Sequence, residues 1–397
     1  MKTLFKLVSV CLLLGILAAC SAPATPAATT APVQPTLTAQ ENWLKASELD
    51  KFSPAKQDWA AIEAAAKKEG TVVVYSNSSR IQDAAKVWAT KYPDIKIVAN
   101  DMGGPEVIIK VREEQKAGAF AGDVWYSAGG PDIEGEFLPK KYLWKFVPDD
   151  LLNVISAEGQ NPIVTASTEV FGWIYNSELN KSCPITNWWE LTDAKWKGKI
   201  FIKDPITSAE DLGMLISFAK HADELAASYK AFYGKDIVLD KDTPDAGWYW
   251  IKKFVQNQPQ GKPGSDDVWK AMATPGMKDN FMGWAPLSKY RNVTDKKAVF
   301  EPCVGLSPVI GVQKRNYMAI INQAPHPNAA KLFIKFALSA EGFAPWNQVG
   351  QYSPRSDVKP IDAAVAFAKL PVWNFENKFV YDNISKYLDF YTLNLLK

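Results

Sequence analysis

Hydroxyl and amide side chains cluster in a short run that could bind an anion. The run follows a β-branched segment and consists of Ser76, Asn77, Ser78, Ser79 and Arg80. Backbone N–H groups at a helix N-terminus, with hydroxyls beside them, bind oxyanions readily. The serines could equally act as helix caps, and the two roles can coexist. We therefore expect a ligand-binding loop at this position.

Two later segments carry side chains of the same kind. Ser127 starts a Ser-Ala-Gly-Gly sequence, and Thr207 and Ser208 stand at a predicted helix start after an Asp-Pro pair. Hydroxyl donors on two sides of a small molecule, with an arginine as charged partner, suit an oxyanion. The expected ligand is a small organic anion, either phosphorylated or carboxylated.

Aromatic side chains are a further class of candidate ligand contacts. The chain has 15 tryptophans, most of which we expect in the core. Tyr175 and Trp284 are candidates for stacking on a sugar or a heterocycle, because their rings offer large apolar faces.

The chain offers little for catalysis. His221 and His326 are its two histidines, which argues against zinc enzymes and against hydrolases with a histidine base. The Gly-Gly pairs at 103–104 and 129–130 do not form a G-x-x-x-x-G-K-[ST] phosphate loop. We expect no enzymatic activity, no catalytic residue, no metal site and no cofactor.

The net charge of the chain indicates which kinds of binding partner to expect. Lys2 and Lys6 are the charged side chains before Cys20, so residues 20–397 carry 43 basic and 43 acidic side chains. Nucleic-acid binding normally needs a basic excess or patch, and neither is visible. We expect a monomer that binds a small molecule and no nucleic acid.

The N-terminus has the layout of an export signal. Two lysines precede an apolar stretch at 7–17, and Leu-Ala-Ala-Cys at 17–20 follows. A basic end, an apolar core of about 7–15 residues and small residues at the cleavage site are typical of a secretory signal. The four residues resemble a bacterial lipobox, which implies that a signal peptide at 1–19 is removed and that Cys20 is lipidated.

A polar spacer follows the predicted lipid attachment site. The segment 21–40 is rich in Ala, Pro, Thr and Ser and has no charge, so it cannot bury enough apolar surface to offset its ordering entropy. We expect a lipidated N-terminus and disordered linker over 20–58, with a folded body from about residue 59. The protein would lie outside the cytoplasm, anchored to the cell membrane or the outer membrane.

Two alternatives to the lipid anchor stay open, a plain signal peptide and a transmembrane anchor. The apolar stretch is short for the second, since a spanning helix needs about 20 apolar residues.

Strand and helix patterns alternate at the start of the body. The predicted elements, in chain order, are helix 59–69, strand 71–75, helix 81–92, strand 96–99, helix 107–117 and strand 123–126. This alternation predicts an open α/β sheet, in which ligands bind beyond the carboxyl ends of the strands. The loops at 76–80, 103–106 and 127–132 should therefore meet at that edge.

Several segments resemble those of a known family. They are EGTVVVYSN, KVREEQKAGAFAGDVWYS, VFGWIYNSEL, NWWELTDAKWKGKIFIKDP, APHPNAAKLFIKFALSAEG and QYSPRSDV, and together they cover nearly the whole body. They resemble the bacterial extracellular solute-binding lipoproteins of ABC importers, in their ferric-iron-type group. The resemblance implies an α/β periplasmic binding protein type 2 fold, with two lobes joined by two crossover strands, and a membrane permease as partner.

The resemblance also implies where the lobes divide. Lobe one would comprise about 59–161 plus 310–397, and lobe two about 162–309, with crossings near 162–168 and 304–312. Cys183 and Cys303 would both lie in lobe two or at its hinge edge, so a disulfide between them is possible. Two separate buried cysteines are the alternative.

The sequence departs from the group's ferric-iron pattern. Ferric binding there typically relies on two adjacent tyrosines, whose phenolate oxygens suit Fe(III), and this chain has no Tyr-Tyr pair. Tyr249, between two tryptophans, is the nearest substitute. A ferric-iron-binding protein therefore stays an alternative function, as does a ligand-binding partner of a sensor kinase or chemoreceptor.

Overall fold

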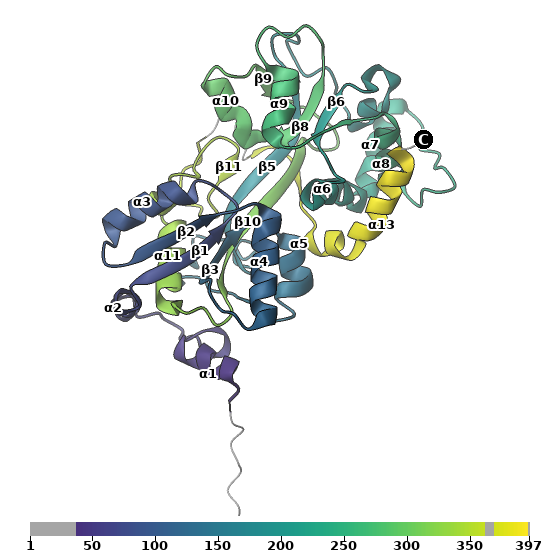
Figure 1. Cartoon of the computed structure of the whole chain (residues 1–397). Coiled ribbons are helices and arrows are strands. Elements are labelled where there is room, and N and C mark those ends of the chain that lie inside the picture. Colours follow the sequence, from purple (N-terminus) through teal and green to yellow (C-terminus); the bar gives the residue numbers. More distant parts are fainter. Residues whose placement is uncertain (1–36, 362–368, 396–397) are drawn as a thin grey trace, which may run out of the picture. The chain divides into compact units, whose positions relative to one another are not determined.

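One mixed sheet runs through the described part of the chain (Figure 1). The computed structural model describes residues 37–361 and 369–395, so the predicted signal peptide, Cys20 and the predicted linker up to residue 36 lie outside the described residues. The strand order is β2-β1-β3-β10-β5-β8-β6-β7, with β4 and β12 paired to β10 and with β9 and β11 paired to β5. Helices alternate with these strands, which confirms the predicted α/β class.

The strands and helices have the following bounds. The strands are β1 Thr71–Ser76, β2 Lys96–Asp101, β3 Val124–Ser127, β4 Leu143–Trp144, β5 Val164–Asn176, β6 Ile200–Lys203, β7 Gln260–Lys262, β8 Met282–Pro286, β9 Phe300–Pro302, β10 Gly311–Ile321, β11 Gln351–Tyr352 and β12 Val372–Asn374. The helices are α1 Ala39–Ala46, α2 Trp59–Glu69, α3 Ile81–Lys91, α4 Gly104–Ala117, α5 Gly130–Asp132, α6 Ala209–Lys220, α7 Ala222–Tyr233, α8 Ala246–Gln256, α9 Ser265–Ala273, α10 Arg291–Thr294, α11 Pro327–Leu338, α12 Ala340–Phe343 and α13 Asn377–Leu395. None of these described helices is both long and apolar enough to cross a membrane.

Two groups of parallel strands occupy the two ends of the strand order. β1 pairs in parallel with β2 and β3, and we call these three strands the first half-sheet. β6 pairs in parallel with β7 and β8, and these form the second half-sheet. The long strands β5 and β10 pair with each other in antiparallel fashion between the two groups, and we call them the linking strands. They overlap the two predicted crossings at 162–168 and 304–312.

Each half-sheet has a buried core of its own. Val74 and Trp88 are fully buried in the core beside the first half-sheet. Trp188, Phe218 and Trp250 are buried in the core beside the second. Parallel strands covered on both faces read as nearly continuous apolar runs, which is why the sequence at 71–75 predicted its strand well.

Local signals fix the ends of the predicted helices. The Asp58 side chain accepts a hydrogen bond from the backbone N–H of Ala61 at 3.0 Å, and so caps α2. Gly70 ends that helix with a φ of 69°, a left-handed conformation that glycine adopts without strain. The predicted helices and strands up to residue 127 agree with the structure to within a few residues.

The folded part begins earlier than the predicted residue 59. Helix α1 starts at Ala39, and Leu44 and Leu49 are buried in the first core. The indole Nε1 of Trp43 donates a hydrogen bond to the carbonyl of Ala324 at 3.1 Å. The expectation of a disordered linker up to residue 58 fails for this stretch, because three apolar side chains dock it on the core.

The C-terminal helix α13 contacts elements of both half-sheets. It packs on α6 and α8 as well as on α5, and the Tyr387 ring stacks on Trp248 of α8 with 4.0 Å between centroids. The predicted lobe one included all of 310–397, whereas these contacts tie α13 to the second core. The predicted lobe boundaries otherwise stay a prediction.

Candidate functional site

A cavity of about 470 Å³, which we call the central cavity, is lined by segments that adjoin the strands of both half-sheets and by residues of linking strand β10. Its lining residues are Asn77, Gly104, Pro105, Ile108, Ala128, Gly129, Gly130, Pro131, Asp132, Lys203, Thr207, Ser208, Ala209, Glu210, Pro263, Lys314, Arg315, Phe375, Asn377 and Ile384. A pocket of this size suits a small organic molecule.

Two helix N-termini contribute to the wall of the central cavity. The first residues of α4 and of α6 line it, and α13 adds a third helical wall. The backbone N–H groups in the first turn of a helix have no intrahelical partner and carry partial positive charge. Both N-termini therefore favour a negatively charged group in the cavity.

Three of the residues predicted from the sequence line the central cavity. Asn77 comes from the loop after β1, and Thr207 and Ser208 come from the segment before α6. The Ser208 hydroxyl also caps α6, since it accepts from the backbone N–H of Asp211 at 3.4 Å. The two predicted hydroxyl segments are thus represented on one cavity, from opposite half-sheets.

The neighbouring serines of the first loop are not among the lining residues. Ser76 is buried, and its Oγ accepts a hydrogen bond from the backbone N–H of Ser78 at 3.2 Å. Ser79 is exposed, and Arg80, which occupies the N-cap position of α3, makes no side-chain capping hydrogen bond. The Ser76 side chain therefore shapes the loop through its bond to Ser78.

Arg80 faces the linking strands and does not line the central cavity. Its Nη1 donates a hydrogen bond to Oε1 of Gln351 at 3.3 Å. Burial and the nearby guanidinium of Arg291 lower its pKa from the ordinary value, while Glu169 acts in the opposite sense. The predicted charged partner of the ligand is thus engaged elsewhere.

Ser127 ends β3, immediately before lining residue Ala128. Its side chain is buried, and its Oγ has no hydrogen-bond partner among the described residues.

The predicted stacking rings lie in or against the cores. Tyr175 and Trp284 are 7% and 5% exposed, on β5 and β8. Tyr249 of α8 packs against Trp189 with 6.1 Å between ring centroids. None of the three lines the central cavity, so neither stacking of a ligand on Tyr175 or Trp284 nor ligation by Tyr249 has support in this arrangement. The strand and helix faces that carry them point to apolar neighbours.

Two lysines that the sequence did not single out supply positive charge to the central cavity. Lys203 ends β6, and its Nζ lies 3.1 Å from Oδ2 of Asp211. Lys314 is on linking strand β10, and its Nζ donates to Oε1 of Glu210. Both carboxylates come from the first turn of α6. The available signal was the Ser-Ala-Glu-Asp sequence at 208–211, which reads as a helix start.

The lysine–carboxylate pairs control the charge of the central cavity. Burial disfavours the Lys314 ammonium, but the carboxylates of Glu210 and Glu169 outweigh it and raise the pKa of Lys314. Burial likewise opposes ionisation of Glu210, but the ammonium groups of Lys314 and Lys203 keep the pKa of the Glu210 carboxyl below its usual value. Both groups are therefore charged at neutral pH.

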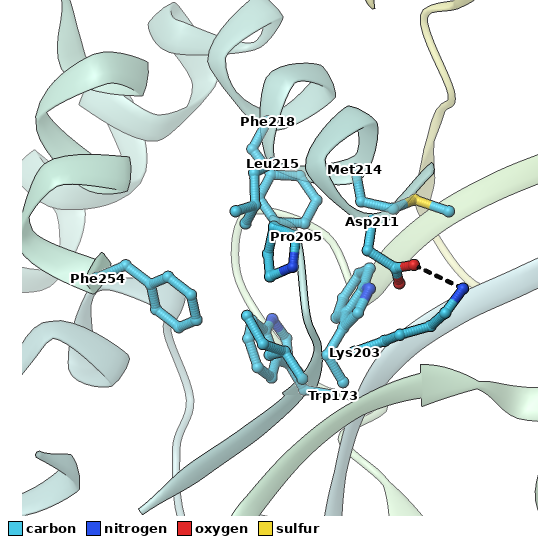
Figure 2. A pocket seen from close by; sticks show the side chains of 10 residues that line it. Trp173, Lys203, Pro205, Asp211, Met214, Leu215, Phe218 and Phe254 are labelled. Atoms are coloured by element: carbon cyan, nitrogen blue, oxygen red, sulfur yellow. Dashed lines mark ion pairs between the residues drawn. The ribbon is translucent and has the colours of Figure 1, made fainter. Parts of the chain in front are cut away.

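Lys203, which is paired with Asp211, lines both the central cavity and a small apolar pocket in the second core. Figure 2 shows this ion pair beside the side chains of Trp173, Met214 and Phe218. The pocket has a volume of only about 10 Å³, which is near the minimum for one water molecule. It is therefore too small for an organic solute.

The cysteine and histidine residues lie outside the central cavity. Cys183 and Cys303 form a disulfide with Cα atoms 5.2 Å apart. His221 Nδ1 lies 2.8 Å from Glu224, and His326 Nδ1 lies 2.9 Å from Asp123. Within the described ranges, no group of three or more His, Cys, Asp or Glu side chains could hold a metal ion.

Comparison with known proteins identifies a family. The model of the bacterial extracellular solute-binding protein family matches residues 83–366. A search of curated proteins finds no match to the sequence.

Three solved structures share the fold at low sequence identity. Iron-bound HitA from Pseudomonas aeruginosa matches with a TM-score of 0.63 and 17% identity, over 82% of this chain and 99% of HitA. The periplasmic binding protein AfuA from Actinobacillus pleuropneumoniae, with exogenous fructose-6-phosphate bound, matches with a TM-score of 0.60 and 20% identity. The match covers 82% of this chain and 99% of AfuA. IdiA (FutA) from Trichodesmium, in complex with iron and citrate, matches with a TM-score of 0.59 and 16% identity. The match covers 83% of this chain and 100% of IdiA. These similarities confirm the predicted periplasmic-binding-protein fold.

Proposed function

Because the chain belongs to the bacterial extracellular solute-binding protein family, we propose that it captures a small anionic organic solute, phosphorylated or carboxylated, and delivers it to an ABC importer. The observation that carries the proposal is the lining of the central cavity. Two lysines and two helix N-termini face one space of about 470 Å³. Each of these groups stabilises negative charge.

Capture needs no bond chemistry from the protein. The lysines, the hydroxyls of Thr207 and Ser208 and the Asn77 amide hold the polar part of the solute. Ile108, Phe375 and Ile384 provide an apolar wall for its carbon skeleton. Closure about the linking strands would remove water and strengthen each charged contact.

The donor set of the central cavity favours an organic anion over a bare ferric ion. No tyrosine or histidine lines the cavity, and the Glu210 carboxylate is paired with a lysine. Ferric iron prefers anionic oxygen ligands such as phenolate. The fructose-6-phosphate found in AfuA, a protein of the same fold, supports the phosphorylated class.

The N-terminal sequence supports attachment to a membrane. We propose that Cys20 carries a lipid and that the protein works outside the cytoplasm as an anchored monomer beside its permease. A partner in a sensor or chemoreceptor would use the same cavity, so the choice between the two partners does not affect the proposed binding chemistry.

A thermal-shift titration of the mature lipoprotein in detergent tests the function. The panel comprises fructose 6-phosphate, citrate, uncharged fructose and Fe(III) chloride. A ligand at 100 times its dissociation constant adds about 2.7 kcal/mol to the free energy of unfolding. We expect a raised midpoint with an organic anion and none with fructose. A shift with Fe(III) alone, together with a visible phenolate absorption band, would contradict the proposal and support the ferric alternative.

A further inference from the structure

Glu210 places a carboxylate inside the central cavity, on the ammonium of Lys314. Glu210 belongs to the first turn of α6, next to the second half-sheet, whereas Lys314 belongs to linking strand β10. The Lys314 side chain is 9% exposed and the Glu210 side chain is 34% exposed. The lysine is therefore fixed in the wall, while its partner reaches solvent through the cavity.

Glu210 differs from the other carboxylates near the two lysines. Asp211 is 7% exposed and is held by both Lys203 and the Ser208 hydroxyl. Glu169 faces Lys314 across the linking strands and accepts from the Ser288 hydroxyl. Among the described residues, Lys314 is the hydrogen-bond donor recorded for Glu210. Glu210 is thus the carboxylate that can turn into solvent without leaving a second donor unsatisfied.

We propose that Glu210 stands in for the acidic group of the solute, whose phosphate or carboxylate binds Lys314 in exchange for the Glu210 carboxylate. This inference rests on the proposed function and adds the position at which the anionic group binds. The exchange keeps the buried Lys314 paired, which avoids the large penalty for leaving a buried charge alone.

The exchange also gives the protein a way to reject inorganic ions. While Glu210 and Asp211 neutralise Lys314 and Lys203, a lone phosphate ion finds little net positive charge. A solute that also covers the apolar wall gains burial energy that can offset the displacement of Glu210. The cavity would therefore select anions with an organic body.

The test compares binding of inorganic phosphate by wild type and by Glu210→Gln, measured by isothermal titration calorimetry on the mature lipoprotein. The variant removes the competing charge, so phosphate should bind about tenfold more tightly. Glu341→Gln is the matched control, because it removes the same charge from an ion pair with Lys91 in α3, outside the cavity. It should leave phosphate binding unchanged.

Two further variants keep the test informative if Glu210→Gln alone disturbs folding. Glu210→Asp keeps the charge but shortens its reach to Lys314, and should tighten phosphate binding by a smaller factor. The double variant Glu210→Gln/Lys314→Gln should bind inorganic phosphate no more tightly than wild type does. Thermal midpoints of all variants report whether they fold.

The outcomes separate this inference from the proposed function. Tighter phosphate binding in Glu210→Gln that disappears in the double variant supports the exchange. Equal phosphate affinities in wild type, Glu210→Gln and Glu341→Gln, with fructose 6-phosphate or citrate still bound by wild type, overturn the exchange alone. Absence of binding of any of these anions to wild type and to Glu210→Gln overturns both proposals.

Discussion

Lys314 is a buried cation on a strand that links the two half-sheets, and a buried ammonium is retained only when carboxylates or ligands neutralise it. Glu210 and Glu169 raise its pKa, so it stays charged. The proposed capture of an anion therefore depends on Lys314 more than on any other residue named above.

Replacing Lys314 should strongly weaken the proposed binding of an anion. For Lys314→Met we expect an affinity for fructose 6-phosphate or citrate about 100-fold lower, because a lost charged contact in a closed site costs about 2–5 kcal/mol. Isothermal titration calorimetry measures this loss. Lys91→Met, which breaks the pair with Glu341, is the control and should bind as wild type does. Equal affinities in the two variants would remove Lys314 from the site.

The proposed lipid on Cys20 would hold the protein at a membrane. Leu-Ala-Ala-Cys at 17–20 resembles a lipobox, so Cys20→Ser should release the protein from the membrane fraction. Incorporation of labelled palmitate, followed by fractionation of cells, checks this. A Cys20→Ser variant that still sediments with membranes would show a different mode of attachment.

At the scale of elements, the linking strands depend on close contact between their backbones. A Cβ at Gly311 of β10 would lie 1.7 Å from the carbonyl oxygen of Phe171 of β5, and neither backbone can move without disturbing the ladder between them. The pairing of β5 with β10 therefore requires glycine at this position.

Gly311→Ala should accordingly destabilise the protein by about 3 kcal/mol, the upper end of ordinary overpacking. The midpoint of urea unfolding measures it. Gly305→Ala is the control, since a Cβ there meets nothing within 4 Å. Similar midpoints for the two variants would contradict the close approach of the linking strands.

At the scale of the whole molecule, the cavity lining predicts motion on binding. Segments that adjoin both half-sheets line one cavity, so a solute that contacts both sides favours their approach. Spin labels at Lys86→Cys of α3 and Val238→Cys after α7 can follow it, because both side chains are strongly exposed and because the disulfide engages Cys183 and Cys303.

We expect the electron–electron distance between these labels to shorten with saturating solute. When Lys314→Met is added to the doubly labelled protein, the same concentration of solute should leave the distance between the labels unchanged. A distance distribution that stays the same when wild-type cavities are filled would show that binding does not move the half-sheets.

The sequence predicted the α/β class and the early elements because their patterns are local. The β-branched run at 71–75 predicts the strand that it forms, and the glycine at 70 predicts the end of the helix before it. The same local signals pointed to Thr207 and Ser208, which immediately precede α6 and line the cavity.

Lys203 and Lys314 could not be predicted in this way. Their role depends on partners in α6, and Lys314 lies 104 residues from Glu210 in sequence. A lysine in a strand pattern normally indicates a solvated face. The misplacement of Tyr175 and Trp284 has the same origin, because periodicity does not tell which side of a strand faces a cavity and which faces a core.

A crystal structure of the complex with the most tightly bound anion of the panel tests the central claim most directly. The account predicts the phosphate or carboxylate of the solute within hydrogen-bond distance of Lys314 Nζ, near the first turn of α6, with the Glu210 carboxylate turned away. A solute held outside the central cavity, or one whose acidic group contacts neither Lys203 nor Lys314, would contradict it.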